Sequence, residues 1–137
     1  MLSEGEFLMW VIEPTKIIVS SLKAAFPIIS IIGFPKGVGV MYELYAKETG
    51  VDGISIDHSV PLNWAANTLQ KHTIVQGNLD NAVLFANKQR IKKDANRILD
   101  ALSSKAFIFN LGHGVLPETP IDNVDYLVNL VKEYRAV

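Results

Sequence analysis

The stretch Ala106-Phe107-Ile108-Phe109-Asn110-Leu111-Gly112-His113-Gly114 contains the structural unit that decides the fold. Residues 106–110 are mostly apolar and predict a short β-strand. Polar and glycine residues at 110–114 indicate a loop at the end of that strand. Because the strand lacks strict alternation of polar and apolar residues, we expect it to belong to a parallel sheet covered on both faces.

The same unit occurs three more times earlier in the chain. Further strands are predicted at residues 28–34, 53–56 and 73–77. Apolar residues at three- and four-residue steps predict helices at 4–25, 38–49, 61–69, from Val83 to Leu102, and at 121–134. Pro14 is expected to kink the first helix or to start its second half, and Gly50 is expected to end the second helix.

Five helices that alternate with four strands predict an α/β fold with parallel pairing and right-handed crossovers. Two architectures satisfy this pattern. One is an open doubly wound sheet, and the other is part of a (β/α)8 barrel, whose full length is ~250 residues. The pattern of apolar residues leaves both architectures open.

The composition excludes several classes of function. With 137 residues, of which 49% are hydrophobic, the chain is expected to form a single domain over residues 1–137. A formal net charge of -1 provides no basic footprint for nucleic acid. The absence of cysteine excludes disulfides and thiolate zinc sites and fits a cytoplasmic protein. The three histidines are scattered, so no metal site is expected, and neither a signal peptide nor a membrane span is predicted.

The loops that follow the strands are the candidate sites, because ligands of parallel α/β proteins bind beyond the carboxyl ends of the strands. Ser59 is expected to cap the helix that starts at Pro61, which leaves Asp57 for a loop contact or a ligand. Asp80, after the third strand, is expected to be an N-cap. The Gly37-Val38-Gly39 sequence lacks the full phosphate-loop motif, so no nucleotide site is predicted.

His113 is the strongest candidate for a binding residue. It lies between two glycines, which let the backbone turn sharply and approach a ligand closely, and its imidazole can donate to a carboxylate. His58 and His72 lack such a frame, and His72 is expected to be structural. No arginine clamp for a polyanion is predicted, because all three arginines fall within or directly after predicted helices and are expected far from the strand ends. They are Arg90, Arg97 and Arg135.

Two segments resemble a known family. The segments Gln76-Gly77-Asn78-Leu79-Asp80 and 109–120 (F-N-L-G-H-G-V-L-P-E-T-P) are similar in sequence and spacing to the C-terminal signature of uroporphyrinogen decarboxylases. The similarity extends over essentially the whole chain. It implies that the chain is the C-terminal half of a (β/α)8 TIM barrel, with four parallel strands alternating with five helices.

The resemblance also implies an activity. The family removes carbon dioxide from the four acetate side chains of uroporphyrinogen III, without a cofactor, and gives coproporphyrinogen III in haem biosynthesis. Protonation of a pyrrole carbon turns the substrate ring into the electron sink for the departing carboxylate. A porphyrinogen is therefore the ligand that the resemblance implies.

Of the family's site residues, the histidine of the N-L-G-H-G motif maps to His113, which is implied to contact the carboxylate side chains of the substrate. Asn78 and Asn110 are further candidates for substrate binding. The family's arginine loop, central aspartate and tyrosine have no counterpart, so no catalytic residue, metal ligand or cofactor is expected in this portion. Where the family commonly has L-D-W, the chain has Ile56-Asp57-His58.

Decarboxylation by this chain alone is not expected, because an N-terminal partner must complete the barrel. Two alternatives remain. A non-catalytic half-barrel would associate with a second copy, since a half-barrel exposes two unpaired strand edges and a large apolar inner face. A degenerate remnant would have no activity or stable fold.

Overall fold

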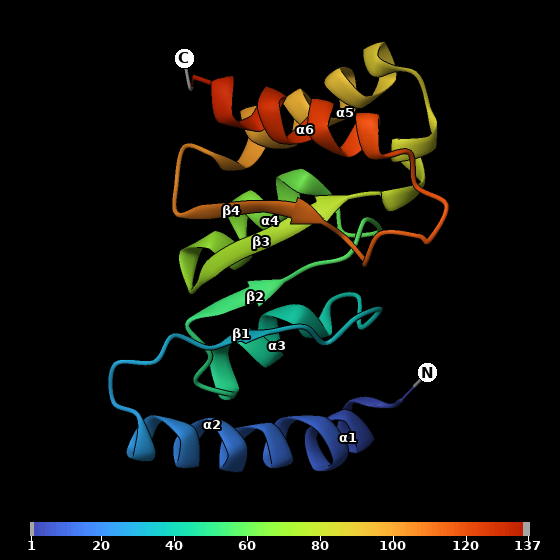
Figure 1. The fold of residues 1–137 in the computed structure, drawn as a ribbon. Helices are drawn as coiled ribbons and strands as arrows, with labels where there is room; N and C mark the ends of the chain where they lie inside the picture. Colours follow the sequence, from blue (N-terminus) through green and yellow to red (C-terminus); the bar gives the residue numbers. More distant parts are fainter. Residues whose placement is uncertain (1, 136–137) are drawn as a thin grey trace.

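The computed structural model describes residues 2–135, which form one parallel sheet with helices packed against it (Figure 1). The strands are β1 (Ile32–Gly33), β2 (Gly53–Ser55), β3 (Ile74–Leu79) and β4 (Phe107–Leu111). The helices are α1 (Glu4–Phe7), α2 (Glu13–Ala25), α3 (Met41–Glu48), α4 (Leu62–Asn67), α5 (Lys88–Leu102) and α6 (Ile121–Glu133). A π-helical turn (Leu8–Ile12) joins α1 to α2, and 3-10 turns lie at Leu69–Lys71 and Asn81–Phe85.

The order of the strands decides between the two architectures. The sheet runs β1-β2-β3-β4, so each connection moves to the next strand in the same direction. A doubly wound sheet would reverse direction at a switch point, whereas a (β/α)8 barrel continues in one direction with its helices on the outer face. The chain is therefore part of a (β/α)8 barrel, and four parallel strands alternating with five helical segments are confirmed when residues 4–25 are counted as one segment.

The two faces of the sheet differ in their coverage. Ile54 and Val75 are completely buried beneath the helices, and Figure 1 shows α3 and α4 behind the strands. On the opposite face, Ile32, Ile74 and Ile108 are 43%, 38% and 40% exposed. The expectation that both faces are covered is therefore wrong, because in a partial barrel the inner face has no opposing strands to pack against.

The strand predicted at residues 28–34 is much shorter in the structure. Only Ile32 and Gly33 pair with β2, and Ile28 is 98% exposed. The backbone N–H of Ile31 donates to Asp52 Oδ2 at 2.8 Å instead of joining a ladder. Because β1 lies at the edge of the sheet, no strand on its other side extends the pairing.

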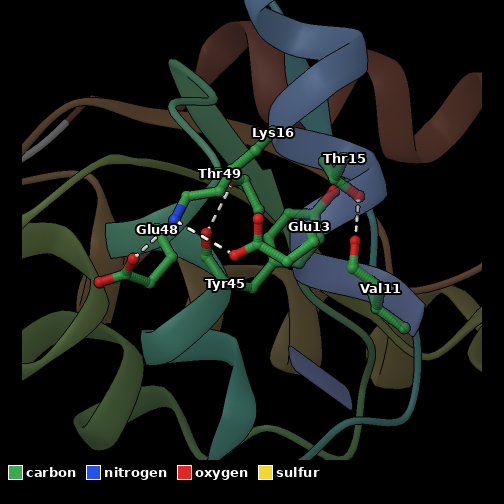
Figure 2. A network of polar contacts seen from close by, with 7 residues as sticks. All are labelled: Val11, Glu13, Thr15, Lys16, Tyr45, Glu48 and Thr49. Carbon is green, nitrogen blue, oxygen red and sulfur yellow. Dashed lines mark hydrogen bonds and ion pairs between the residues drawn. The ribbon is translucent and has the colours of Figure 1, made fainter. Parts of the chain in front are cut away.

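The first helix is continuous despite Pro14. The π-helical turn at residues 8–12 lies immediately before this proline, which cannot donate a backbone hydrogen bond. Figure 2 shows how the helix is attached to α3: Lys16 Nζ lies 3.1 Å from Glu48 Oε2 and 3.6 Å from Glu13 Oε1. In the last turn of α2, Lys23 Nζ lies 2.7 Å from Asp52 Oδ1.

The single helix predicted from Val83 to Leu102 is in fact two segments, so that prediction is wrong. Val83 belongs to the 3-10 turn, where Asp80 accepts a hydrogen bond from Ala82 N and so confirms its predicted capping role. The helix α5 then begins after Asn87, whose side chain accepts from Arg90 N at 2.9 Å. Two successive capping residues interrupt the run, because each satisfies the free N–H groups of a new helical segment.

Candidate functional site at the carboxyl ends of the strands

The loops after β2, β3 and β4 are in direct contact. The N–H of Gly112 donates to the carbonyl of Leu79 at 2.7 Å, which ties the β4 loop to the end of β3. Gly112 also lies against the β2 loop, where an added Cβ would come within 2.5 Å of the His58 backbone nitrogen. Gly112 is therefore required for close packing within the chain, rather than for the approach of a ligand that its sequence context suggested.

Asp57 is buried and fully engaged by the fold. Its carboxylate accepts hydrogen bonds from Gly37 N and the Tyr42 hydroxyl, both at 2.8 Å, and from the backbone and hydroxyl of Ser59. Burial by itself raises the pKa of Asp57, but the hydrogen bonds from Ser59, Tyr42 and Gly37 outweigh it and hold the pKa at about 2. Asp57 therefore connects the β1 loop, α3 and the β2 loop as an ionised group.

The prediction that Ser59 caps the following helix is wrong. The N-cap of α4 is Pro61, and no side chain caps that helix. Ser59 instead donates to Asp57, so the two residues form a local unit within the loop. The Gly37 N–H, which a phosphate loop would direct at an anion, donates to the same carboxylate.

The two candidate asparagines are register partners on β3 and β4, yet their environments differ. Asn78 is buried, and its Nδ2 donates to the carbonyls of Asp57 at 3.2 Å and Val60 at 2.9 Å. Asn110 is exposed, and its Oδ1 accepts from Leu111 N at 2.8 Å. Asn78 therefore uses its amide nitrogen within the fold, whereas Asn110 presents part of its amide to solvent.

His113 is exposed on a loop that is held on both sides. Gly112 donates to Leu79, and Asn81 Nδ2 donates to the carbonyl of Gly114 at 2.7 Å. Within residues 2–135, the imidazole of His113 has no hydrogen-bond partner. The two backbone contacts fix the position of the loop, and the exposed imidazole keeps its full hydrogen-bonding capacity.

A cavity that the sequence did not reveal lies between α4 and α5. It has a volume of about 570 Å³, and Arg90 and Arg97 line it together with His58 and Asp80 from the strand-end loops. The expectation that the arginines lie far from the strand ends is therefore wrong for these two. Arg97 follows Arg90 by seven residues, which places the two side chains on one face of α5. The sequence does not show which loops that face meets.

His72 lies near the other end of the sheet, where its Nε2 is 3.7 Å from Glu43 Oε1. In the part of the chain that the structure describes, three or more potential metal ligands do not gather at any point. Within the same residues, no helix combines the length and apolar character that crossing a membrane requires.

Ligands of (β/α)8 barrels bind at the carboxyl ends of the strands, and the exposed His113 follows β4 at that end of this partial barrel. The family model of uroporphyrinogen decarboxylase (URO-D) matches residues 1–134. The chain belongs to the uroporphyrinogen decarboxylase family.

Curated relatives give the extent of this similarity. Uroporphyrinogen decarboxylase from Orientia tsutsugamushi (strain Ikeda) is 54% identical over 132 residues, which are 96% of this chain and 38% of that protein. The proteins of the same name from Rhodospirillum rubrum and Neorickettsia sennetsu are each 49% identical, over 98% and 95% of this chain and 39% of their own lengths. The chain thus spans about two fifths of the length of these relatives.

Proposed function

We propose that this chain supplies one side of the active-site barrel of a uroporphyrinogen decarboxylase, with His113 contacting carboxylate side chains of the porphyrinogen. The observation that carries the proposal is the free imidazole on a loop fixed by Gly112 and Gly114. An imidazole can donate a hydrogen bond in its neutral and its protonated state, so it suits a carboxylate ligand. Asn110, three residues earlier and within β4, offers a second exposed polar group near the end of that strand.

The chemical step needs groups beyond those that this chain provides. Decarboxylation begins when a proton adds to a pyrrole carbon; the bond to the carboxylate carbon then breaks and its electron pair enters the ring as carbon dioxide leaves. A proton then adds to the remaining methylene carbon, and the ring carbon loses the first proton, which gives the methyl group. Asp57 is unsuited to donate that proton, because its pKa of about 2 leaves it ionised near neutral pH and its oxygens are occupied. In our proposal the proton donor therefore belongs to the complementary part of the barrel.

The complementary part is proposed to be a preceding four-strand segment. The inner face leaves Ile32, Ile74 and Ile108 about two fifths exposed, and both β1 and β4 are edge strands. Apolar surface and unpaired backbone groups of this kind favour association with further strands. The relatives are longer than this chain, which also supports a further segment as the part that completes the barrel. A cytoplasmic setting, which the absence of cysteine favours, is part of the proposal.

The test is an assay of coproporphyrinogen formation under anaerobic conditions. The chain alone is expected to give no product, and adding the complementary segment of the Orientia tsutsugamushi relative should restore turnover. In that mixture, His113→Ala should raise KM at least tenfold, whereas His72→Ala, at the opposite end of the sheet, should leave KM unchanged. Turnover by the chain alone, or equal KM values for the two variants, would contradict the proposal.

The alternative in which two copies associate rests on the same edge strands. Sedimentation velocity, with and without the complementary segment, distinguishes pairing with that segment from pairing with a second copy of the chain. A monomer that forms a one-to-one complex with the complementary segment supports the proposal. A stable dimer that excludes the segment favours self-association. A cooperative thermal transition of the isolated chain is expected, and its absence would favour a degenerate remnant.

A further inference from the structure

The cavity between α4 and α5 lies on the helix side of the sheet and is not lined by His113. Its walls come from the β2 loop and the start of α4 (residues 58–63), the end of β3 (78–80), and one face of α5. The α5 residues in the wall extend from Arg90 to Ala101, which at 1.5 Å per residue corresponds to roughly 16 Å of helix. We call this space the helix-side cavity.

The charged side chains that line the helix-side cavity differ in whether they already have a hydrogen-bond or ion-pair partner. Asp94, which is 8% exposed, is paired with Arg90 through its Oδ2. Asp80 uses its Oδ1 to cap the N–H of Ala82. Arg97, by contrast, has neither a hydrogen-bond nor an ion-pair partner within residues 2–135. The unpaired positive group in the lining is therefore the guanidinium of Arg97.

The rest of the wall is mixed. Apolar side chains line one part of it: Val60, Leu62, Val83, Ile98 and Ala101. The neutral polar residues Ser59, Asn63 and Asn78 also line the cavity. The volume of about 570 Å³ lies within the range of pockets that bind small organic molecules, ~300–1,000 Å³. His58, which is exposed at the rim, adds a second donor.

From this arrangement we infer that the helix-side cavity binds an organic monocarboxylate, whose carboxylate pairs with Arg97 and whose hydrocarbon body lies against the apolar wall. The planar guanidinium matches a carboxylate in two parallel hydrogen bonds. A dianion is disfavoured because the two aspartates bring negative charge into the same space. The inference does not depend on the proposed decarboxylation, since it uses neither His113 nor the open face of the sheet.

The test titrates the full chain with hexanoate and follows amide ¹H–¹⁵N shifts. We expect saturable binding with a dissociation constant on the order of 1 mM, with the largest shifts at Leu62, Val83 and Arg97. Inorganic phosphate and hexanamide serve as probes, one lacking the hydrocarbon body and the other the charge. Both are expected to bind at least tenfold more weakly than hexanoate.

The variant Arg97→Gln should weaken hexanoate binding at least tenfold. Lys92→Gln is the matched control, because Lys92 is an exposed cation of the same helix that does not line the cavity. Both variants should keep the wild-type thermal transition, since both side chains are exposed. The inference is overturned if hexanoate gives no saturable shifts, if phosphate binds as tightly, or if the two variants weaken binding equally.

Discussion

The loops after β2 and β4 each carry a polar residue close to the end of a strand, but the structure uses the two residues in opposite ways. Asp57 is 3% exposed and accepts hydrogen bonds from three different residues. His113 is exposed and has no hydrogen-bond partner in the part of the chain that the structure describes. The comparison teaches that a polar residue at a strand end is architectural when its hydrogen-bonding capacity is filled and available for a ligand when it is not.

Replacing the two residues should separate these roles most clearly. Asp57→Ala removes the acceptor for Gly37 N, the Tyr42 hydroxyl and Ser59, and leaves buried donors unsatisfied. We expect a loss of about 4 kcal/mol in the free energy of unfolding, measured by urea denaturation. His113→Ala should leave the urea midpoint unchanged. Similar losses for the two variants would remove the distinction between the loops.

Glycine substitutions test which loop position is fixed by packing. A Cβ at Gly112 would meet backbone atoms of His58 and Asp57 at 2.5 to 3.1 Å, and backbone cannot move aside as a flexible side chain can. Gly112→Ala should therefore cost about 3 kcal/mol of unfolding free energy. Gly114→Ala is the matched control, because nothing lies within 4 Å of its added Cβ. Equal thermal stability of the two variants would show that the β4 loop is not held against the β2 loop.

Much of the fold could be predicted from sequence, because the unit of strand, polar loop and helix repeats four times. The strand order does not follow from apolar runs, which do not specify neighbours. The barrel was predicted from the resemblance to a known family, and the strand order confirms it. The strand at residues 28–34 was predicted too long because its β-branched residues resemble a paired strand, whereas the edge position leaves Ile28 exposed. Pairing depends on a neighbouring strand, which local sequence does not reveal.

The candidate site divides in the same way. The capping role of Asp80 could be predicted from its position before a helix and is confirmed. The motif indicates His113 as a binding residue, and this role stays a prediction. The role of Asp57 in joining the β1 loop, α3 and the β2 loop could not be predicted, because its partners Gly37 and Tyr42 lie 20 and 15 residues away in sequence. The cavity between α4 and α5 was missed for a related reason: the rotation of α5 about its axis is set by packing.

The dependence of stability on acid pH tests whether Asp57, after β2, is an ionised structural group. The pKa of Asp57 is lowered from 3.8 to about 2 in the folded chain, so its stabilisation is fully present above pH 4 and is lost as the pH falls toward 2. This loss should be about 2 kcal/mol. Comparing urea denaturation of wild type and Asp57→Asn from pH 5 to 2 isolates it from other carboxylates. A pH dependence that is identical in the two proteins would contradict the assignment of an ionised, hydrogen-bonded carboxylate.

The smallest expected difference concerns the paired asparagines of β3 and β4. Asn78→Ala removes two buried hydrogen bonds to the carbonyls of Asp57 and Val60, and should cost about 1.5 kcal/mol. Asn110→Ala removes one exposed contact to the next residue's N–H and should cost about 0.5 kcal/mol. Urea denaturation resolves this difference. If Asn110→Ala proved as destabilising as Asn78→Ala, the Asn110 side chain would be needed for stability at the end of β4, and the structure would no longer favour its being available to a ligand.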